Sequence, residues 1–237
     1  MLTQEQKKAT TTLKGIVCLK AGAGTGKTTV LVERYYLIIL NLLKQGLSIE
    51  RALESILAVT FTKKAAEEMK QRVIYKLKEK FKDIDILKQE SLKQHAYIST
   101  IDSFAYRFLK ENALDIRIYS DFEVIDEIEA KIIFLNQGKL VLNQKGIPLV
   151  LTEKWIDDFL EDIYLYILDL RLNTINASQF RKMIIKKQDL LFNIISKLYL
   201  AYEEELKRKK FFDFAGLLLE SVKALRTYPY INSLKPA

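Results

Sequence analysis

A glycine-rich run is the feature that most constrains the fold of this chain. It follows an apolar segment at residues 16–20, precedes a helical pattern at residues 27–45, and reads Ala21-Gly22-Ala23-Gly24-Thr25-Gly26-Lys27-Thr28. Glycines let the backbone turn tightly and present N–H groups to phosphate oxygens, and the start of a helix adds partial positive charge. The run therefore predicts a strand, a phosphate-binding loop and a helix, in that order.

Two side chains of this loop carry the predicted chemistry. The Lys27 ammonium is expected to neutralise phosphate oxygens, and the Thr28 hydroxyl is expected to coordinate Mg²⁺, so both are the predicted catalytic groups. The strict motif has glycine where Ala21 stands. The alternative to a phosphate-binding loop is a glycine-rich turn that matches the motif by chance. The predicted nucleotide contacts in the loop are Ala21, Gly22, Ala23, Gly24, Thr25, Gly26, Lys27, Thr28 and Thr29.

Strand and helix patterns alternate through the first part of the chain, as in parallel sheets with crossover helices. We predict strands at residues 16–20, 56–61 and 97–101 and helices at 27–45, 64–81 and 103–112. Beyond residue 115 the apolar spacing becomes helical, with helices expected near residues 125–135, 156–170 and 180–208. The predicted organisation is an α/β lobe at 1–114, a helical insertion at 115–210 and a return to the lobe at 211–237.

Composition narrows the setting and the partners. The net charge is +8, and residues 1–110 alone hold 20 Lys and Arg against 11 Asp and Glu, or +9. Concentrated positive charge suits a nucleic-acid partner, although an ordinary basic surface would look the same. The longest apolar run is interrupted by Glu33 and Arg34, and the chain starts without a signal-peptide pattern, so we expect a cytoplasmic protein with no membrane contact. Cys18, in an apolar stretch, is predicted to be a buried thiol.

The loop sequence resembles that of the superfamily 1 DNA helicases UvrD, Rep and PcrA and of the RecB/AddA recombination helicases. Leu2-Thr3-Gln4-Glu5-Gln6 is similar to the family's Q motif, in which the glutamine, here Gln6, reads the adenine edge. Thr3 and Gln6 also have the spacing of a helix capping box, and the two roles are compatible.

Two further segments resemble the family's DNA-contacting motifs. Residues 58–69 are similar to motif Ia, and this implies that single-stranded DNA is contacted by Thr60, Phe61, Thr62 and Lys64. Without the resemblance, the segment indicates only a buried strand and an amphipathic helix. Residues 99–104 resemble the next motif and imply contacts from Thr100 and Phe104. The family usually has histidine at Asp102, and because an acid would repel phosphate, we predict that Asp102 is a helix N-cap.

Residues 212–218 resemble the segment Asp-Phe-x-Asp-Leu-Leu by which the family's chain returns from its helical insertion, with Gly216 in place of the second acid. The loop and the four other matches, in the family's order, imply a RecA-like P-loop lobe with an inserted helical subdomain, using ATP and Mg²⁺ on single-stranded DNA or on DNA with a single-stranded end. Residues 121–130 look more like the RecB/AddA branch than like Rep. The implied enzyme is an ATP-dependent DNA helicase of repair or recombination.

ATP hydrolysis in P-loop enzymes needs an acidic pair at the end of an apolar strand. The family's Asp-Glu-x-Gln-Asp segment does not occur in this sequence, and Asp126-Glu127 leads into helical spacing, so we predict that it begins a helix instead. We therefore expect this chain alone to bind nucleotide without efficient hydrolysis. Unwinding would need a C-terminal helicase portion or a partner chain.

Two other classes of protein share some of these features. A small-molecule or nucleotide kinase would use the same Lys27 and Thr28 but has no need of the Phe61-Thr62 element. A degenerate relative could serve as an inactive DNA-binding or assembly module, although the intact Lys27 argues against loss of nucleotide binding.

Overall fold

The computed structural model describes residues 2–22, 24–82, 86–143, 153–185 and 189–228. The chain forms two compact units, the first reaching Phe104 and the second beginning at Ala105. Its described part is mixed α/β, mostly helical, with two small parallel sheets.

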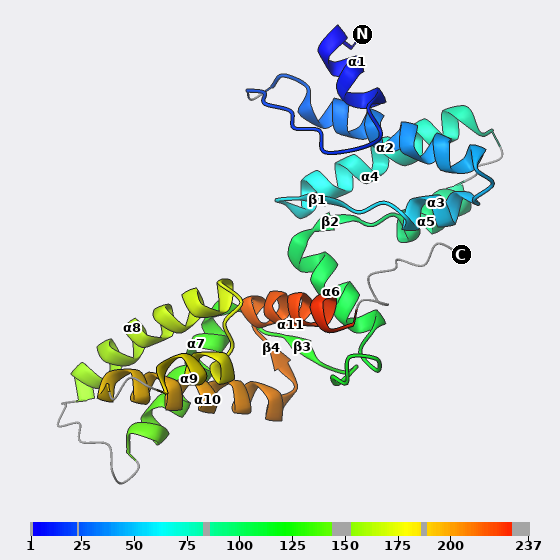
Figure 1. Ribbon diagram of the computed structural model, residues 1–237. Coiled ribbons are helices and arrows are strands. Elements are labelled where there is room, and N and C mark those ends of the chain that lie inside the picture. The colour runs from blue at the N-terminus through cyan, green and yellow to red at the C-terminus, as the bar shows by residue number, and fades with distance from the viewer. Residues whose placement is uncertain (1, 23, 83–85, 144–152, 186–188, 229–237) are drawn as a thin grey trace. The chain divides into compact units, whose positions relative to one another are not determined.

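Unit 1 is built around one pair of parallel strands. β1 (Ala58–Thr60) pairs with β2 (Ile98–Thr100) in a register that joins Ala58 to Ile98 and Thr60 to Thr100. The two strands lie side by side next to α4 (Figure 1). The helices of the unit are α1 (Gln4–Thr11), α2 (Lys27–Lys44), α3 (Ile49–Glu54), α4 (Lys63–Lys80) and α5 (Ile86–His95), and α6 (Ile101–Glu111) continues into unit 2.

The core of unit 1 lies between α2, α4 and the strands. α4 buries Met69, Val73 and Leu77 at helical spacing, as its sequence pattern predicts. Ile39 of α2 and Ile98 of β2 are almost fully enclosed in the same cluster. The first helix is tied to α2 by Arg34, which donates to the backbone oxygens of Ala9 and Thr12.

The strand predicted at residues 16–20 is wrong. These residues have no regular secondary structure, and Ile16 is fully exposed. A β-strand is stabilised by a neighbour that shares its backbone hydrogen bonds. Within the described residues, β1 and β2 pair only with each other, so segment 16–20 has no strand partner. The prediction for Cys18 fails with it, because the thiol is exposed.

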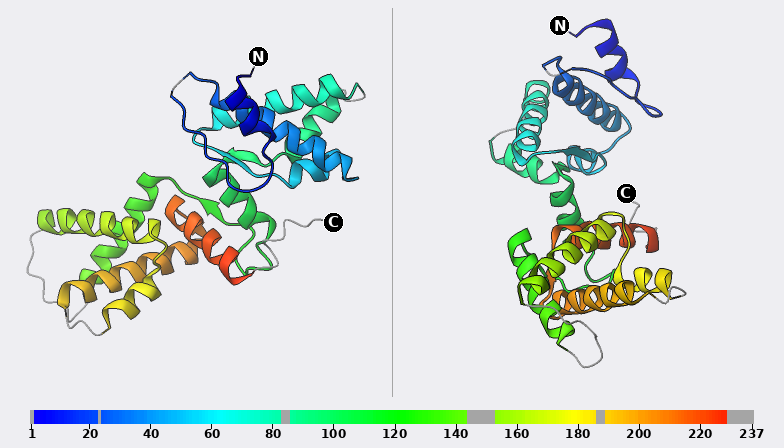
Figure 2. Two further views of the ribbon diagram at one scale, coloured as in Figure 1. Left: turned by 45° about the horizontal axis from the view of Figure 1, so that its top comes forward. Right: turned by 90° about the vertical axis from the view of Figure 1, so that its left-hand side faces the viewer.

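Unit 2 is a helical assembly with a small parallel sheet. β3 (Glu123–Val124) pairs with β4 (Phe211–Phe212), two segments far apart in the sequence. α7 packs against α8 and α10, while α9 packs against α10 (Figure 2). The helices are α7 (Glu127–Leu142), α8 (Glu153–Leu172), α9 (Ala177–Ile184), α10 (Leu190–Lys209) and α11 (Phe214–Thr227).

Most of the predicted helical spacing in this unit is confirmed. Leu160, Ile163 and Ile167 of α8 face the core, together with Phe134 of α7. The single helix predicted at 180–208 is wrong, because α9 ends at Ile184 and α10 starts at Leu190, and residues 186–188 lie outside the described part. The C-terminus of α10 is basic and is closed by Lys210, which has a φ of 58°.

No helix within the described ranges is both long enough and apolar enough to cross a bilayer.

Candidate functional site

The glycine-rich loop leads directly into α2, and its backbone depends on two glycines. Gly24 and Gly26 have φ values of 73° and 85°, a left-handed conformation that residues with a Cβ rarely adopt. Gly26 is the N-cap residue of α2, where no side chain accepts a hydrogen bond from the first turn and no acidic residue is present. The positive end of an 18-residue helix therefore faces the loop without a side-chain cap. Ala23 lies outside the described residues.

Lys27 and Thr25 close the loop on itself. The Lys27 ammonium donates to the backbone oxygens of Ala21 and Gly22, at 2.7 Å in each case. The Thr25 hydroxyl donates to Gly22 O at 2.8 Å. Thr28 and Thr29 are exposed in the first turn of α2. The Lys27 ammonium thus already lies over the loop. A bound phosphate would replace its two carbonyl acceptors with anionic oxygens, which form stronger hydrogen bonds.

Gln6 joins α1 to this loop. Its Oε1 accepts from Thr3 N at 2.9 Å and its backbone N–H donates to the Thr3 hydroxyl, which confirms the predicted capping box. Its Nε2 donates to Thr25 O at 3.1 Å. Because an amide nitrogen carries two hydrogens, one donor of Gln6 remains for a ligand while the other contacts the loop.

The carboxyl ends of β1 and β2 bring the two predicted DNA-contacting segments together. Thr60 and Thr100 are register partners in adjacent parallel strands. Phe61 follows Thr60 and has a relative exposure of 104%, so its whole ring meets solvent. Thr62 is the N-cap of α4, accepting from Ala65 N at 3.1 Å, and Lys64 is exposed in the first turn. A large exposed ring beside a helix start resembles the platforms that stack bases and hold phosphates.

The prediction that Asp102 is an N-cap is wrong. α6 begins at Ile101, and the Thr100 hydroxyl accepts from Ser103 N at 3.2 Å, so Thr100 occupies the capping position. Asp102 lies in the first turn, where its negative charge complements the helix dipole. Phe104 is half-buried on the same helix.

The acidic pair Asp126-Glu127 begins a helix, as predicted. Asp126 is the N-cap of α7 and accepts from Glu129 N at 2.8 Å, and Glu127 is the first residue of that helix. The Asp126 carboxylate therefore already satisfies a helix end in unit 2.

Comparison with known proteins decides the family. A family model described as "UvrD/REP helicase N-terminal domain" matches residues 2–234. The chain belongs to the UvrD/REP helicase family. This confirms the resemblance that the loop and the motifs at residues 2–6, 58–69, 99–104 and 212–218 predicted, and the match spans both units.

The relatives of this UvrD/REP helicase domain are larger proteins. A "Probable DNA helicase" of Mycoplasma pneumoniae is 31% identical over 236 residues, which is 95% of this chain and 37% of the relative. An "ATP-dependent helicase/nuclease" chain of Clostridium acetobutylicum is 33% identical over 83% of this chain and 15% of its own length. A protein of the same description from Exiguobacterium sibiricum is 38% identical over 54% of this chain and 11% of its own length. The chain thus spans a minor part of each of these relatives.

The sequence did not reveal a buried ionic cluster in the helical unit of this UvrD/REP helicase domain. Arg171, at the end of α8, is 4% exposed and donates to Asp213 Oδ1 at 2.7 Å. Tyr202 OH donates to Asp213 Oδ2 at 2.7 Å, and Gly216 N donates to Oδ1. Although burial disfavours its charge, the Asp213 carboxylate raises the pKa of Arg171 above its ordinary value. The one available signal was an arginine within the apolar pattern of α8.

Proposed function

We propose that this chain is the ATP-binding part of an ATP-dependent DNA helicase or translocase of repair or recombination, acting in the cytoplasm. In this proposal residues 1–114 belong to a RecA-like lobe, 115–210 form its helical insertion, and 211–237 return to the lobe. The family match supports the assignment.

One observation carries the nucleotide part of the proposal, namely the uncapped start of α2 directly after the glycine-rich loop. Gly24 has no atom within 4 Å of where a Cβ would lie, so the space beside this residue is open. We assign Lys27 to the phosphate oxygens, Thr28 to Mg²⁺, and the amides of the loop and the first helical turn to the remaining oxygens. Bound Mg²⁺ would neutralise charge on the phosphates.

The DNA part of the proposal depends on the strand ends. We assign Phe61 to base stacking, and the hydroxyls of Thr60, Thr62 and Thr100 with the ammonium of Lys64 to backbone phosphates. Phe104 lies on the helix that follows Thr100 and would support that edge. The first 110 residues supply the excess positive charge that such binding requires.

Hydrolysis and unwinding are proposed to need more than this chain. Of the acidic pair that the sequence offers, Asp126 caps α7 and accepts from Glu129 N, and Glu127 is the first residue of that helix. The carboxylates that hold Mg²⁺ and orient water would then come from a C-terminal helicase portion or a partner chain.

Phe61→Ala tests the DNA assignment. We expect the chain to bind a fluorescein-labelled single-stranded oligonucleotide, with an affinity that falls steeply as salt increases. The substitution should weaken this binding about tenfold, because stacking of one base on an aromatic ring contributes ~1–3 kcal/mol. The fold should be unaffected, since the Phe61 ring is fully exposed. Fluorescence anisotropy at two salt concentrations measures both effects.

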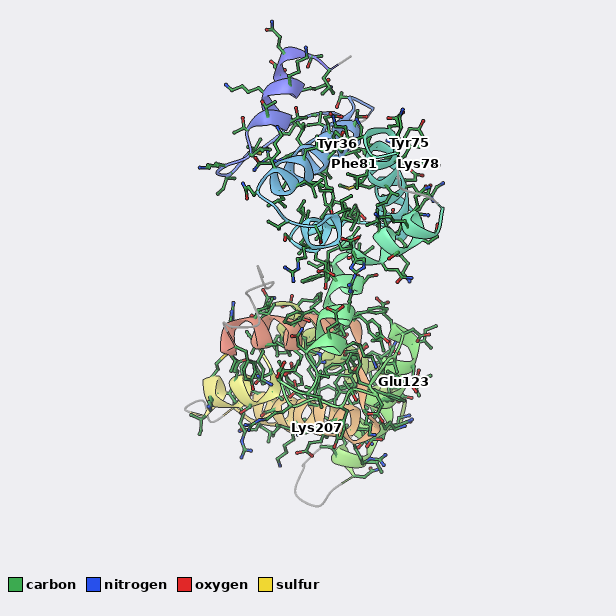
Figure 3. The ribbon with its side chains drawn as sticks, turned by 90° about the vertical axis from the view of Figure 1, so that its right-hand side faces the viewer. Tyr36, Tyr75, Lys78, Phe81, Glu123 and Lys207 are labelled. Atoms are coloured by element: carbon green, nitrogen blue, oxygen red, sulfur yellow. The ribbon has the colours of Figure 1, made fainter. Side chains whose placement is uncertain are left out.

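Tyr75→Ala is the matched control. Tyr75 is also an exposed aromatic residue of unit 1, on α4, with an exposure of 61% (Figure 3). Equal affinities for the wild-type chain and for both variants would refute the assignment of Phe61, and the absence of oligonucleotide binding at low salt would refute the DNA part of the proposal.

A further inference from the structure

A cavity of about 360 Å³ lies within unit 2, and none of its lining residues is assigned to ATP or to DNA. Its walls come from the segment 116–119, the start of α9, the end of α10, β4 and α11. A volume in this range suits a small-molecule ligand.

One wall of the cavity is aromatic. Tyr119 is 51% exposed, and Phe211 and Phe212 are half-buried beside it in the lining. The Lys210 ammonium lies 5.0 Å from the centre of the Tyr119 ring. An exposed ring already contacted by a cation on one side can offer its remaining surface to a planar group.

The lining is also positive. It holds five cationic residues against the two acids Glu203 and Glu220, and one of the five, Arg171, is paired with Asp213 outside the lining. Lys210 and Lys223 pair with Asp121 and Glu220. The exposed Lys207 and Arg117 form no ion pair with any residue in the described ranges. Figure 3 shows Lys207 on α10. Unneutralised cations at a cavity favour an anionic ligand.

The buried side of the cavity presents a polar atom that lacks a partner. Arg171 lines the cavity and is only 4% exposed, yet its Nε–H has no acceptor in the described part of the chain. Leaving a buried donor without an acceptor is unfavourable, and a ligand acceptor would remove this cost. Ser178, in the first turn of α9, lines the same cavity. Burial raises the pKa of the Glu203 carboxyl, which also lines the cavity.

We propose that this cavity binds a nucleoside phosphate, with the base against Tyr119 and the phosphate at Lys207 and Arg117. A base supplies the flat face that the aromatic wall fits and an acceptor for the Arg171 Nε–H, and the phosphate matches the unpaired cations. The ligand is either a free nucleotide or one unit of a single strand. The site shares no residue with the glycine-rich loop or with the ends of β1 and β2.

Binding measurements on the full chain carrying Lys27→Ala and Phe61→Ala separate this site from the proposed ATP and DNA residues. We would titrate thymidine monophosphate by calorimetry and a labelled thymidine oligonucleotide by anisotropy. Tyr119→Ala and Lys207→Ala are then added singly. Lys197→Ala is the matched control, because Lys197 is an exposed lysine of α10 that does not line the cavity. Thermal unfolding of each variant confirms that it folds.

We expect Tyr119→Ala and Lys207→Ala each to weaken binding about tenfold, with no change for Lys197→Ala. Loss of monophosphate binding identifies a free nucleotide as a ligand, whereas loss confined to the oligonucleotide identifies a strand. Failure of the chain to bind either ligand, or equal affinities for all three variants, would overturn the proposal. Failure of the proposed function would instead appear as wild-type behaviour of Lys27→Ala with Mg-ATP and of Phe61→Ala with the oligonucleotide.

Discussion

Replacing Arg171 with methionine is expected to lower the free energy of unfolding of unit 2 by about 3–5 kcal/mol. Arg171 and Asp213 form an ion pair in which both side chains are at most 5% exposed. Removing the guanidinium leaves the Asp213 carboxylate buried, with hydrogen bonds from Tyr202 and Gly216 but no positive charge. The cost of an uncompensated buried charge exceeds the hydrophobic gain from methionine.

Urea denaturation followed by tryptophan fluorescence measures this loss. The sequence contains one tryptophan, Trp155, and it lies on α8 with Arg171, so its signal reports unit 2. Arg181→Met on α9 is the control, because Arg181 is exposed and the same change there should cost within about 0.5 kcal/mol. Equal midpoints and slopes for the two variants would show that the buried pair contributes nothing to stability.

Gly216→Ala is expected to cost about 3 kcal/mol, although alanine normally favours a helix. A Cβ at this position would overlap Arg171 Nη2 and lie 2.6 Å from Asp213 Oδ1. Both atoms are held by their mutual ion pair, so neither can move without weakening it. Gly216 therefore provides the space that the guanidinium occupies.

A double-mutant cycle with Arg171→Met tests this explanation. Methionine removes the Nη2 atom, so the added cost of Gly216→Ala in that background should fall to about 1 kcal/mol or less. If the two losses are additive, the steric explanation is wrong and the cost of the alanine has another source.

The buried cluster around Arg171 and Asp213 accounts for a difference from the family pattern that the sequence alone did not explain. The return segment has Gly216 where the related pattern has a second acid. In the structure, Asp213 alone caps α11 and accepts from Arg171, and the backbone of Gly216 approaches both. Spacing along one helix cannot show this, because Arg171 comes from α8, 42 residues earlier.

Local patterns predicted the elements that local interactions specify. The helices at Lys27–Lys44 and Lys63–Lys80 followed from apolar spacing, and the capping box of Thr3 and Gln6 followed from two residue types three positions apart. The strand at residues 16–20 failed because a strand needs a partner, which segment composition does not supply. Asp102 was assigned wrongly because Thr100, two residues earlier, caps the same helix.

The candidate site was predictable to a similar degree. The loop residues and the two parallel strands that contain Thr60 and Thr100 followed from local sequence patterns. The contact of Gln6 with Thr25 and the cavity beside Tyr119 did not, because both join segments whose distance in space the sequence leaves open.

Isothermal titration of the chain with Mg-ATP tests most directly whether the loop grips phosphate through Lys27. We expect saturable binding in the wild-type chain. Lys27→Ala should lower the affinity about 100-fold, because a hydrogen bond to a charged group contributes ~1.5–3 kcal/mol. The control Lys44→Ala, at the far end of α2, should change the affinity little. A single binding heat without the continuing heat of turnover is also predicted. No saturable heat at millimolar Mg-ATP with folded protein, or equal affinity for Lys27→Ala and the wild-type chain, would contradict the account.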